Sequence, residues 1–231
     1  MCVLRVRVKF TKQGPIQYVG HLDMMRYFQK ALRRAEFDVA FSEGFSPHMI
    51  MSFASPLGVG VTSRGEYFDV DLNTLTTSAD MIKRLNEVMV EGVTIESIRQ
   101  VAENKKDKAM TLVGGADYLV TIKDESYFDD FEEKFKIFME QKEIMVVKKT
   151  KKSENSVDIR PFIHDFSYPS DKTLYLRVTS GSENNLKPNL VLQAFYDYLG
   201  RELPSFSYHV ERLDTFTKDF ISLGEIGEII E

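Results

Sequence analysis

Three polar side chains near the start of the sequence have the types and spacing that acid-base chemistry requires. His21 and Asp23 lie two residues apart, and His48 follows in a loop rich in Ser, Gly and Pro. Two imidazoles with a carboxylate can hold a transition metal, and histidine also transfers protons near neutral pH. In the simpler interpretation, the carboxylate of Asp23 interacts favourably with the dipole at the start of a helix, and His21 donates a hydrogen bond to a backbone carbonyl. The sequence leaves both interpretations open.

A row of cations lies on the helix that the sequence predicts from about residue 21 to residue 36. These side chains fall within an arc of about 100°, opposite the apolar residues. They are Arg26, Lys30, Arg33 and Arg34. The alternating strand expected at residues 3–10 adds Arg5, Arg7 and Lys9 on what we expect to be its outer face. The cations form a solvated helix face, a surface for RNA or another polyanion, or a contact for an acidic protein.

Two further motifs favour shape or structure over chemistry. In residues 42–48, Gly44 permits a positive φ and Pro47 fixes a turn, while Phe45 either plugs a core gap or stacks on a base. The plug is the favoured use. Asp158 and Arg160 alternate as on a strand edge, where we expect them to pair in a structural role. A lysine-rich run at residues 148–152 either aids solubility or contacts phosphate.

The elements that must position these residues occur twice along the chain. Residues 1–103 predict the order strand, helix, strand, strand, helix, strand, and residues 116–217 repeat it. This β-α-β-β-α-β order is typical of the ferredoxin-like fold, in which two helices cover an antiparallel sheet. We therefore expect an α+β chain of two ferredoxin-like halves, with a linker at residues 104–115 and an acidic, apolar tail at residues 218–231.

Composition excludes several classes of function. The single cysteine, Cys2, allows no internal disulfide, no zinc site built mainly on thiolates and no three-cysteine cluster of the kind radical-SAM enzymes need. We expect no cofactor and no metal. No apolar run is long enough to span a bilayer and the start lacks a signal peptide, so we expect a cytoplasmic protein without membrane contact. The net charge is −5, but residues 1–50 carry eight Lys and Arg against four Asp and Glu, which permits a local basic patch.

Several ordered motifs together give a resemblance to a known family. They read GP (14–15), GHLDMMR (20–26), ALRRA (31–35), FSEGFSPH (41–48), SFASPLGVG (52–60), EYFDV (66–70) and VDIRPFI (157–163). With these motifs the sequence resembles the radical-SAM-associated, or radical-SAM-linked, proteins, a bacterial domain family of unknown function. Ser46 stands where histidine is common in the family, which weakens a metal or catalytic site built on two histidines in that loop.

The resemblance implies a domain that occurs alone or fused to the C-terminal end of a radical-SAM protein, and it carries over no catalytic residue. We expect the stand-alone form here, with a radical-SAM protein as its partner. Together with the basic helix, this indicates a non-catalytic accessory module that contacts RNA or another polyanion. The alternative is an RNA-processing or metal-dependent enzyme that uses His21, Asp23 and His48.

Overall fold

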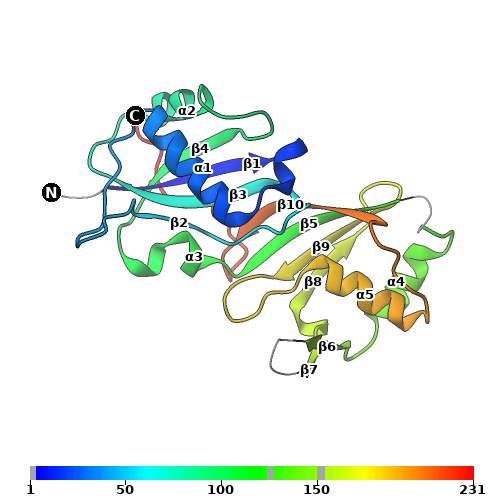
Figure 1. Ribbon diagram of the computed structural model, residues 1–231. Helices are drawn as coiled ribbons and strands as arrows, with labels where there is room; N and C mark the ends of the chain where they lie inside the picture. Colours follow the sequence, from blue (N-terminus) through cyan, green and yellow to red (C-terminus); the bar gives the residue numbers. More distant parts are fainter. Residues whose placement is uncertain (1–3, 124–126, 150–153) are drawn as a thin grey trace. The chain divides into compact units, whose positions relative to one another are not determined.

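The computed structural model describes residues 4–123, 127–149 and 154–231. The chain divides into unit 1, made of Met1–Gly115 with Arg212–Glu231, and unit 2, made of Ala116–Glu211 (Figure 1). The sheet pairing is mostly antiparallel and the helices are few, which confirms the mixed α+β class. Residues 104–115 and 218–231, expected as a linker and a tail, both belong to unit 1. Cys2 and residues 150–152 of the lysine run lie outside the described residues.

In unit 1, helices are interspersed with strands of one antiparallel sheet. Its elements are β1 (Leu4–Lys12), η1 (Gly14–Tyr18), α1 (His21–Arg34), β2 (Met51–Phe53), β3 (Thr62–Leu72), α2 (Ser78–Asn86), β4 (Ile95–Val101), η2 (Lys105–Asp107) and α3 (Ala109–Leu112). β4 pairs with β1, and β1 pairs with β3. The other side of β3 carries β2 and, from Arg212 onward, the end of β10 (Tyr208–Phe216).

Helix α1 forms because its apolar residues recur at helical spacing and therefore share one face. Met24, Phe28 and Leu32 on this face are at most 3% exposed and pack with Val6 and Val8 of β1. Full burial of each such side chain stabilises the fold by about 1.5–3 kcal/mol. The helix ends in a Schellman motif, in which the N–H of Phe37 donates to the carbonyl of Leu32 at 3.0 Å. The predicted helix and its core face are thus confirmed.

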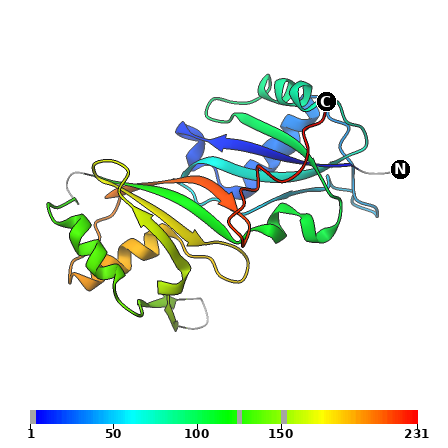
Figure 2. The same ribbon diagram turned by 180° about the vertical axis from the view of Figure 1, so that it is seen from behind.

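The opposite face of the same sheet is also covered. Tyr67 of β3 packs there with Ala109 and Val113, and with Leu223 of the C-terminal segment. This segment then pairs with the edge strand β4, where the N–H of Glu228 donates to the carbonyl of Gln100 at 2.9 Å. Figure 2 shows the segment running from β10 to a C-terminus that lies beside α2. The sheet of unit 1 therefore has protein on both faces.

Unit 2 contains strands of a sheet and a separate two-stranded ribbon. Its elements are β5 (Gly115–Ile122), α4 (Phe131–Met139), β6 (Met145–Lys149), β7 (Glu154–Asp158), η4 (Arg160–Phe162), β8 (Ile163–Ser167), β9 (Thr173–Thr179) and α5 (Pro188–Tyr198). The start of β10, β5, β9 and β8 lie side by side in that order, while β6 pairs with β7. Phe131, Phe135 and Phe138 of α4 contact Phe195 of α5 with ring centroids 5.0–5.4 Å apart.

The longest helix of the described residues, α1, has 14 residues. Within the described ranges, no helix combines the length and the hydrophobicity that crossing a bilayer requires.

Candidate functional site

The cations of α1 lie on a helix face that is open to solvent. All four are exposed, and the Arg26 side chain retains 70% of its accessible area. Their position follows from the burial of the other face of α1, because a helix that packs on one side must present its remaining residues outward. The structure therefore confirms the predicted exposure of Arg26, Lys30, Arg33 and Arg34.

The contacts of these cations are peripheral. Arg26 Nη1 lies 3.1 Å from Asp23 Oδ1, and both side chains are largely exposed. Arg34 Nη2 donates to the carbonyl of Val88 at 3.2 Å. An exposed ion pair is worth about 0–1 kcal/mol, so Asp23 does not hold Arg26 strongly. The distance along the axis from Arg26 to Arg34 is roughly 12 Å. The face thus presents four positive charges that can still engage an anionic ligand.

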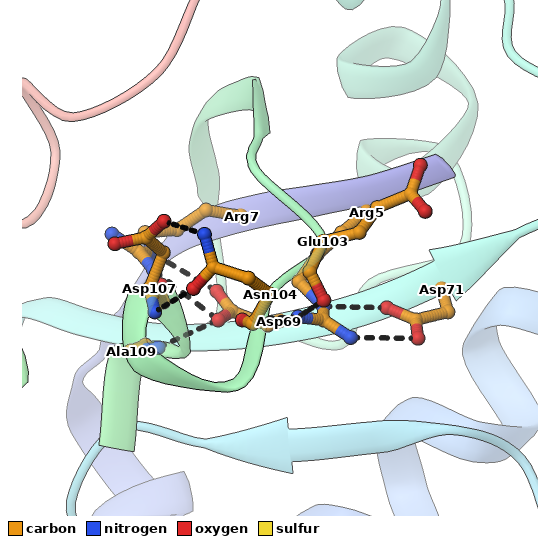
Figure 3. A network of polar contacts seen from close by, with 8 residues as sticks. All are labelled: Arg5, Arg7, Asp69, Asp71, Glu103, Asn104, Asp107 and Ala109. Atoms are coloured by element: carbon orange, nitrogen blue, oxygen red, sulfur yellow. Dashed lines mark hydrogen bonds and ion pairs between the residues drawn. The ribbon is translucent and has the colours of Figure 1, made fainter. Parts of the chain in front are cut away.

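The prediction of a second exposed basic face, on β1, is wrong for two of its three residues. Arg5 is 5% exposed and Arg7 is 2% exposed. The pairing register places Asp71 of β3 opposite Arg5, and Asp69 opposite Arg7. Figure 3 shows both guanidinium groups against these carboxylates and beside the chain segment that runs from Glu103 to Ala109. The alternation of β1 identified the face correctly, but that face is not open to solvent.

The ion pairs of β1 and β3 hold this segment in place. Arg5 donates from Nε to Asp71 at 2.7 Å and from Nη1 to the Glu103 carbonyl at 2.8 Å. The hydrogen bond to Asp71 raises the pKa of Arg5, although burial opposes it. Arg7 Nε lies 2.9 Å from Asp69 Oδ1, and the N–H of Ala109 donates to Asp69 Oδ2 at 2.6 Å. These groups are internal and structural.

Lys9, the third cation of β1, is intermediate. Its Nζ atom lies 3.3 Å from Glu96 Oε2, and its side chain retains 23% of its accessible area. Lys9 therefore contributes little free charge.

The structure does not bring His21, Asp23 and His48 together. The ring centroid of His21 lies 5.2 Å from that of Phe53, on the side of the sheet that α1 covers. Asp23 points to solvent, where it pairs with Arg26. His48 lines a cavity of about 160 Å³ with Arg5, whose side chain points to the other face of β1. Among the described residues, no three His, Cys, Asp or Glu side chains gather as a metal ion would require.

The loop at residues 42–48 is closed at its base and open at its tip. Ser42 Oγ lies 2.8 Å from His48 Nδ1 and accepts from the His48 N–H at 3.1 Å. Gly44 has φ +107°, as its residue type predicted. Phe45 is fully exposed, so the favoured prediction that it plugs the core is wrong. Pro47 is exposed as well.

Asp158 and Arg160 do not form the ion pair that their spacing predicted, but both bond to the backbone. Asp158 Oδ1 accepts from the N–H groups of Ile144 at 2.8 Å and of Arg160 at 3.0 Å. Arg160 Nε donates to the Met139 carbonyl at 3.0 Å. Together they tie the end of α4 to β6 and η4 within unit 2, which is a structural arrangement.

A buried polar cluster beside β3 escaped the sequence analysis. Glu66 is 3% exposed and lies 3.0 Å from Arg212, while Lys12 Nζ donates to the Val19 carbonyl at 2.8 Å. Burial raises the pKa of Glu66, against the effect of Arg212, and lowers the pKa of Lys12. Glu66, Lys12 and His21 line a cavity of about 10 Å³, which has room for about one water molecule. Glu66 follows a glycine in an alternating strand, but its partner lies far along the chain and gave no local signal.

Comparisons with known proteins identify the family but give little beyond it. No curated protein matches the chain significantly. A chain in a crystal structure of a Cbf5-Nop10-Gar1 complex is similar with a TM-score of 0.43 and 10% identity, over 92% of this chain and 50% of that one. This chain thus spans half of the longer one, and a likeness at this level carries no argument.

A family described as uncharacterized proteins conserved in bacteria matches residues 5–188, which is most of the sequence. The matched range includes α1 and its four cations, the loop at residues 42–48 and the Asp158–Arg160 turn. The chain therefore belongs to this family of uncharacterized bacterial proteins, DUF2344.

Proposed function

We propose that this protein is a non-catalytic binding module that contacts RNA, or another polyanion, through the exposed face of α1. One observation carries the proposal: four cations share a solvent-facing stripe on a helix whose reverse side is buried. Lys and Arg at this density neutralise several phosphates at once and release the counterions bound to them.

The guanidinium groups suit phosphate, although the same planar fork also fits carboxylates. Three of the four cations are arginine, whose planar fork binds two phosphate oxygens at once. Arg33 and Arg34 are adjacent at the end of α1, where the helix dipole also favours positive charge. The 181 residues after residue 50 carry more Asp and Glu than Lys and Arg, so their net charge does not favour a polyanion.

The resemblance to radical-SAM-linked proteins supports a radical-SAM protein as the partner. In this proposal the module holds an RNA substrate for that partner, which supplies the reaction, in the cytoplasm. We also propose that each unit is ferredoxin-like. The strand orders β4-β1-β3 with β2, and β10-β5-β9-β8, support this. If the separate ribbon of β6 and β7 is left out, the first of the four strands in each unit lies between the third and the fourth.

The test is the binding of a fluorescein-labelled single-stranded RNA of mixed sequence, followed by anisotropy across a salt series. Four phosphate contacts give a slope of log K against log salt of about −3. Replacing Arg26, Lys30, Arg33 and Arg34 by Gln should remove most of this slope. The matched control replaces Lys105, Lys106, Lys142 and Lys187, which are also exposed but lie outside α1.

The control should bind as the unchanged protein does. Equal losses in both variants would mean that the protein responds to net charge alone. A flat salt dependence in the unchanged protein would remove the nucleic-acid proposal.

A further inference from the structure

A groove in unit 2 lies apart from every residue discussed as a cation site. Its volume is about 550 Å³, within the range of ligand-binding clefts. Phe138 of α4 and Ala194 of α5 are buried side chains that line it. Met145, Val147 and Tyr198 also line it while 47–56% exposed, so the groove presents apolar surface to solvent.

One wall of the groove is the edge of a strand. Residues 144–147 line it consecutively, whereas a groove over one face of β6 would be lined by alternate residues. β7 occupies the other edge, and no residue of β7 lines the groove. Within the described parts of the chain, β6 pairs with β7 and with no other strand. The edge of β6 that faces the groove is therefore open.

The open edge has backbone groups ready to pair. Ile144 uses its carbonyl to accept from the N–H of Ile159 at 2.9 Å, so the backbone of Ile144 points toward β7. Because successive residues of a strand direct their N–H and C=O groups to opposite edges, those of Met145 and Val147 point away from β7. An added strand would find these donors and acceptors in place.

The charges on the groove select the partner. Among the described lining residues, the charged ones are Glu143 and Asp197, and both side chains are exposed. Asp197 Oδ1 accepts from Gln193 Nε2 at 2.8 Å, one turn earlier on α5. Complementarity at such a surface requires basic residues on the ligand.

We propose that this groove binds an extended peptide segment of a protein partner, with alternating apolar and basic side chains, as a third strand on the open edge of β6. Main-chain hydrogen bonds to Met145 and Val147 supply affinity. Apolar side chains of the peptide pack over Phe138 and Ala194, and its basic side chains meet Glu143 and Asp197. This mode of recognition adds a strand to an exposed edge and reads alternate side chains in pockets.

Synthetic peptides test the proposal on the full chain. The probe is a blocked seven-residue peptide of alternating leucine and lysine, and its counterpart alternates leucine and glutamate. Isothermal titration should show the lysine peptide binding at least about tenfold more tightly. Changing Glu143 and Asp197 to Lys should reverse that preference. Glu133→Lys with Glu140→Lys, at exposed positions that do not line the groove, is the matched control and should leave it unchanged.

Amide hydrogen exchange gives a readout specific to strand addition. The lysine peptide should slow exchange at Met145 and Val147 but change little at Val146, whose N–H already faces β7. Uniform protection along β6, or none, overturns the added strand even if the peptide binds. Equal binding of both peptides, or binding by neither, overturns the site itself. The proposal does not depend on RNA binding by α1, so either can fail alone.

Discussion

Two rows of arginine in unit 1 share their residue type, yet they have opposite environments. Arg5 and Arg7 on β1 are buried and paired with Asp71 and Asp69, whereas Arg33 on α1 is exposed. The difference lies in the neighbouring element. A strand must lie beside another strand, and here β3 carries carboxylates at the matching positions. A helix that packs by one face needs no neighbouring element on its other face, so side chains there stay in solvent.

The comparison predicts that stability and ligand binding rank these residues in opposite order. Removing an internal arginine should cost folding free energy without changing RNA affinity. Removing an exposed arginine should cost affinity and leave stability almost unchanged.

The largest effect is expected from Arg7→Ala. It leaves the Asp69 carboxylate, whose residue is 2% exposed, without its cation, and breaking one side of a buried pair costs about 3–5 kcal/mol. Urea unfolding measures this change, and Arg33→Ala, expected within about 0.5 kcal/mol, is the reference. The double change Arg7→Met with Asp69→Leu should recover only part of the loss, because it removes the unpaired charge but also the hydrogen bond that Asp69 accepts from the Ala109 N–H. Equal costs at Arg7 and Arg33 would contradict the comparison.

A smaller and pH-dependent effect is expected at Tyr67, on the same covered face of β3. Its hydroxyl donates to Asp214 at 2.5 Å, and burial, followed by the charge of Asp214, raises the pKa of Tyr67 above its ordinary value of 10.0. The folded chain then keeps the phenol proton at pH values where the unfolded chain has lost it. The contribution to stability is therefore complete below about pH 10 and declines as pH rises above it.

Tyr67→Phe checks this sign. At about pH 8 the variant should be less stable by about 1–2 kcal/mol, because Asp214 loses a hydrogen bond. The gap should narrow as unfolding is measured at increasing pH above about 10. A gap that widens with pH would show that the phenol is not held protonated by the fold.

The smallest effect is expected from Lys9→Ala, which separates pairing from burial. Lys9 shares a strand with Arg7 and is also paired with a carboxylate, but it is partly exposed. Its loss should cost no more than about 1 kcal/mol in urea unfolding. Raised salt should shrink that cost further while leaving the cost of Arg7→Ala nearly intact. A cost near that of Arg7 would assign the effect to pairing alone.

The sequence predicted those features that depend on residues close together in the chain. The helical spacing of Met24, Phe28 and Leu32 identified α1, its buried face and, by difference, its exposed cations. The alternation of β1 placed Arg5 and Arg7 on one face, but the cover of that face comes from residues 103–109 and from the C-terminal segment. That information is not contained in the strand. Asp69 and Asp71 alternate in the same way in β3, and pairing the two patterns would have revealed the ion pairs.

The functional candidates show the same limit. Residue types and spacing grouped His21, Asp23 and His48. In the structure, His21 contacts Phe53 on the α1 side of the sheet, whereas His48 lines a cavity with Arg5, whose side chain points to the other side. The unit 2 groove had no motif at all, because its walls come from α4, β6 and α5 and combine ordinary apolar and polar residues. Open strand edges depend on what fails to pair with them, which only the assembled structure reveals.

The division of the chain has a consequence for synthesis. Unit 1 is discontinuous, since its last residues, from Arg212 on, follow the whole of unit 2. A ribosome therefore releases Glu66 well before Arg212, its counterion, exists. Until then the nascent sheet lacks the strand that completes one side of β3. During this time the buried charges of unit 1 are not all paired. A fragment that stops at residue 115 would keep that unfinished state permanently.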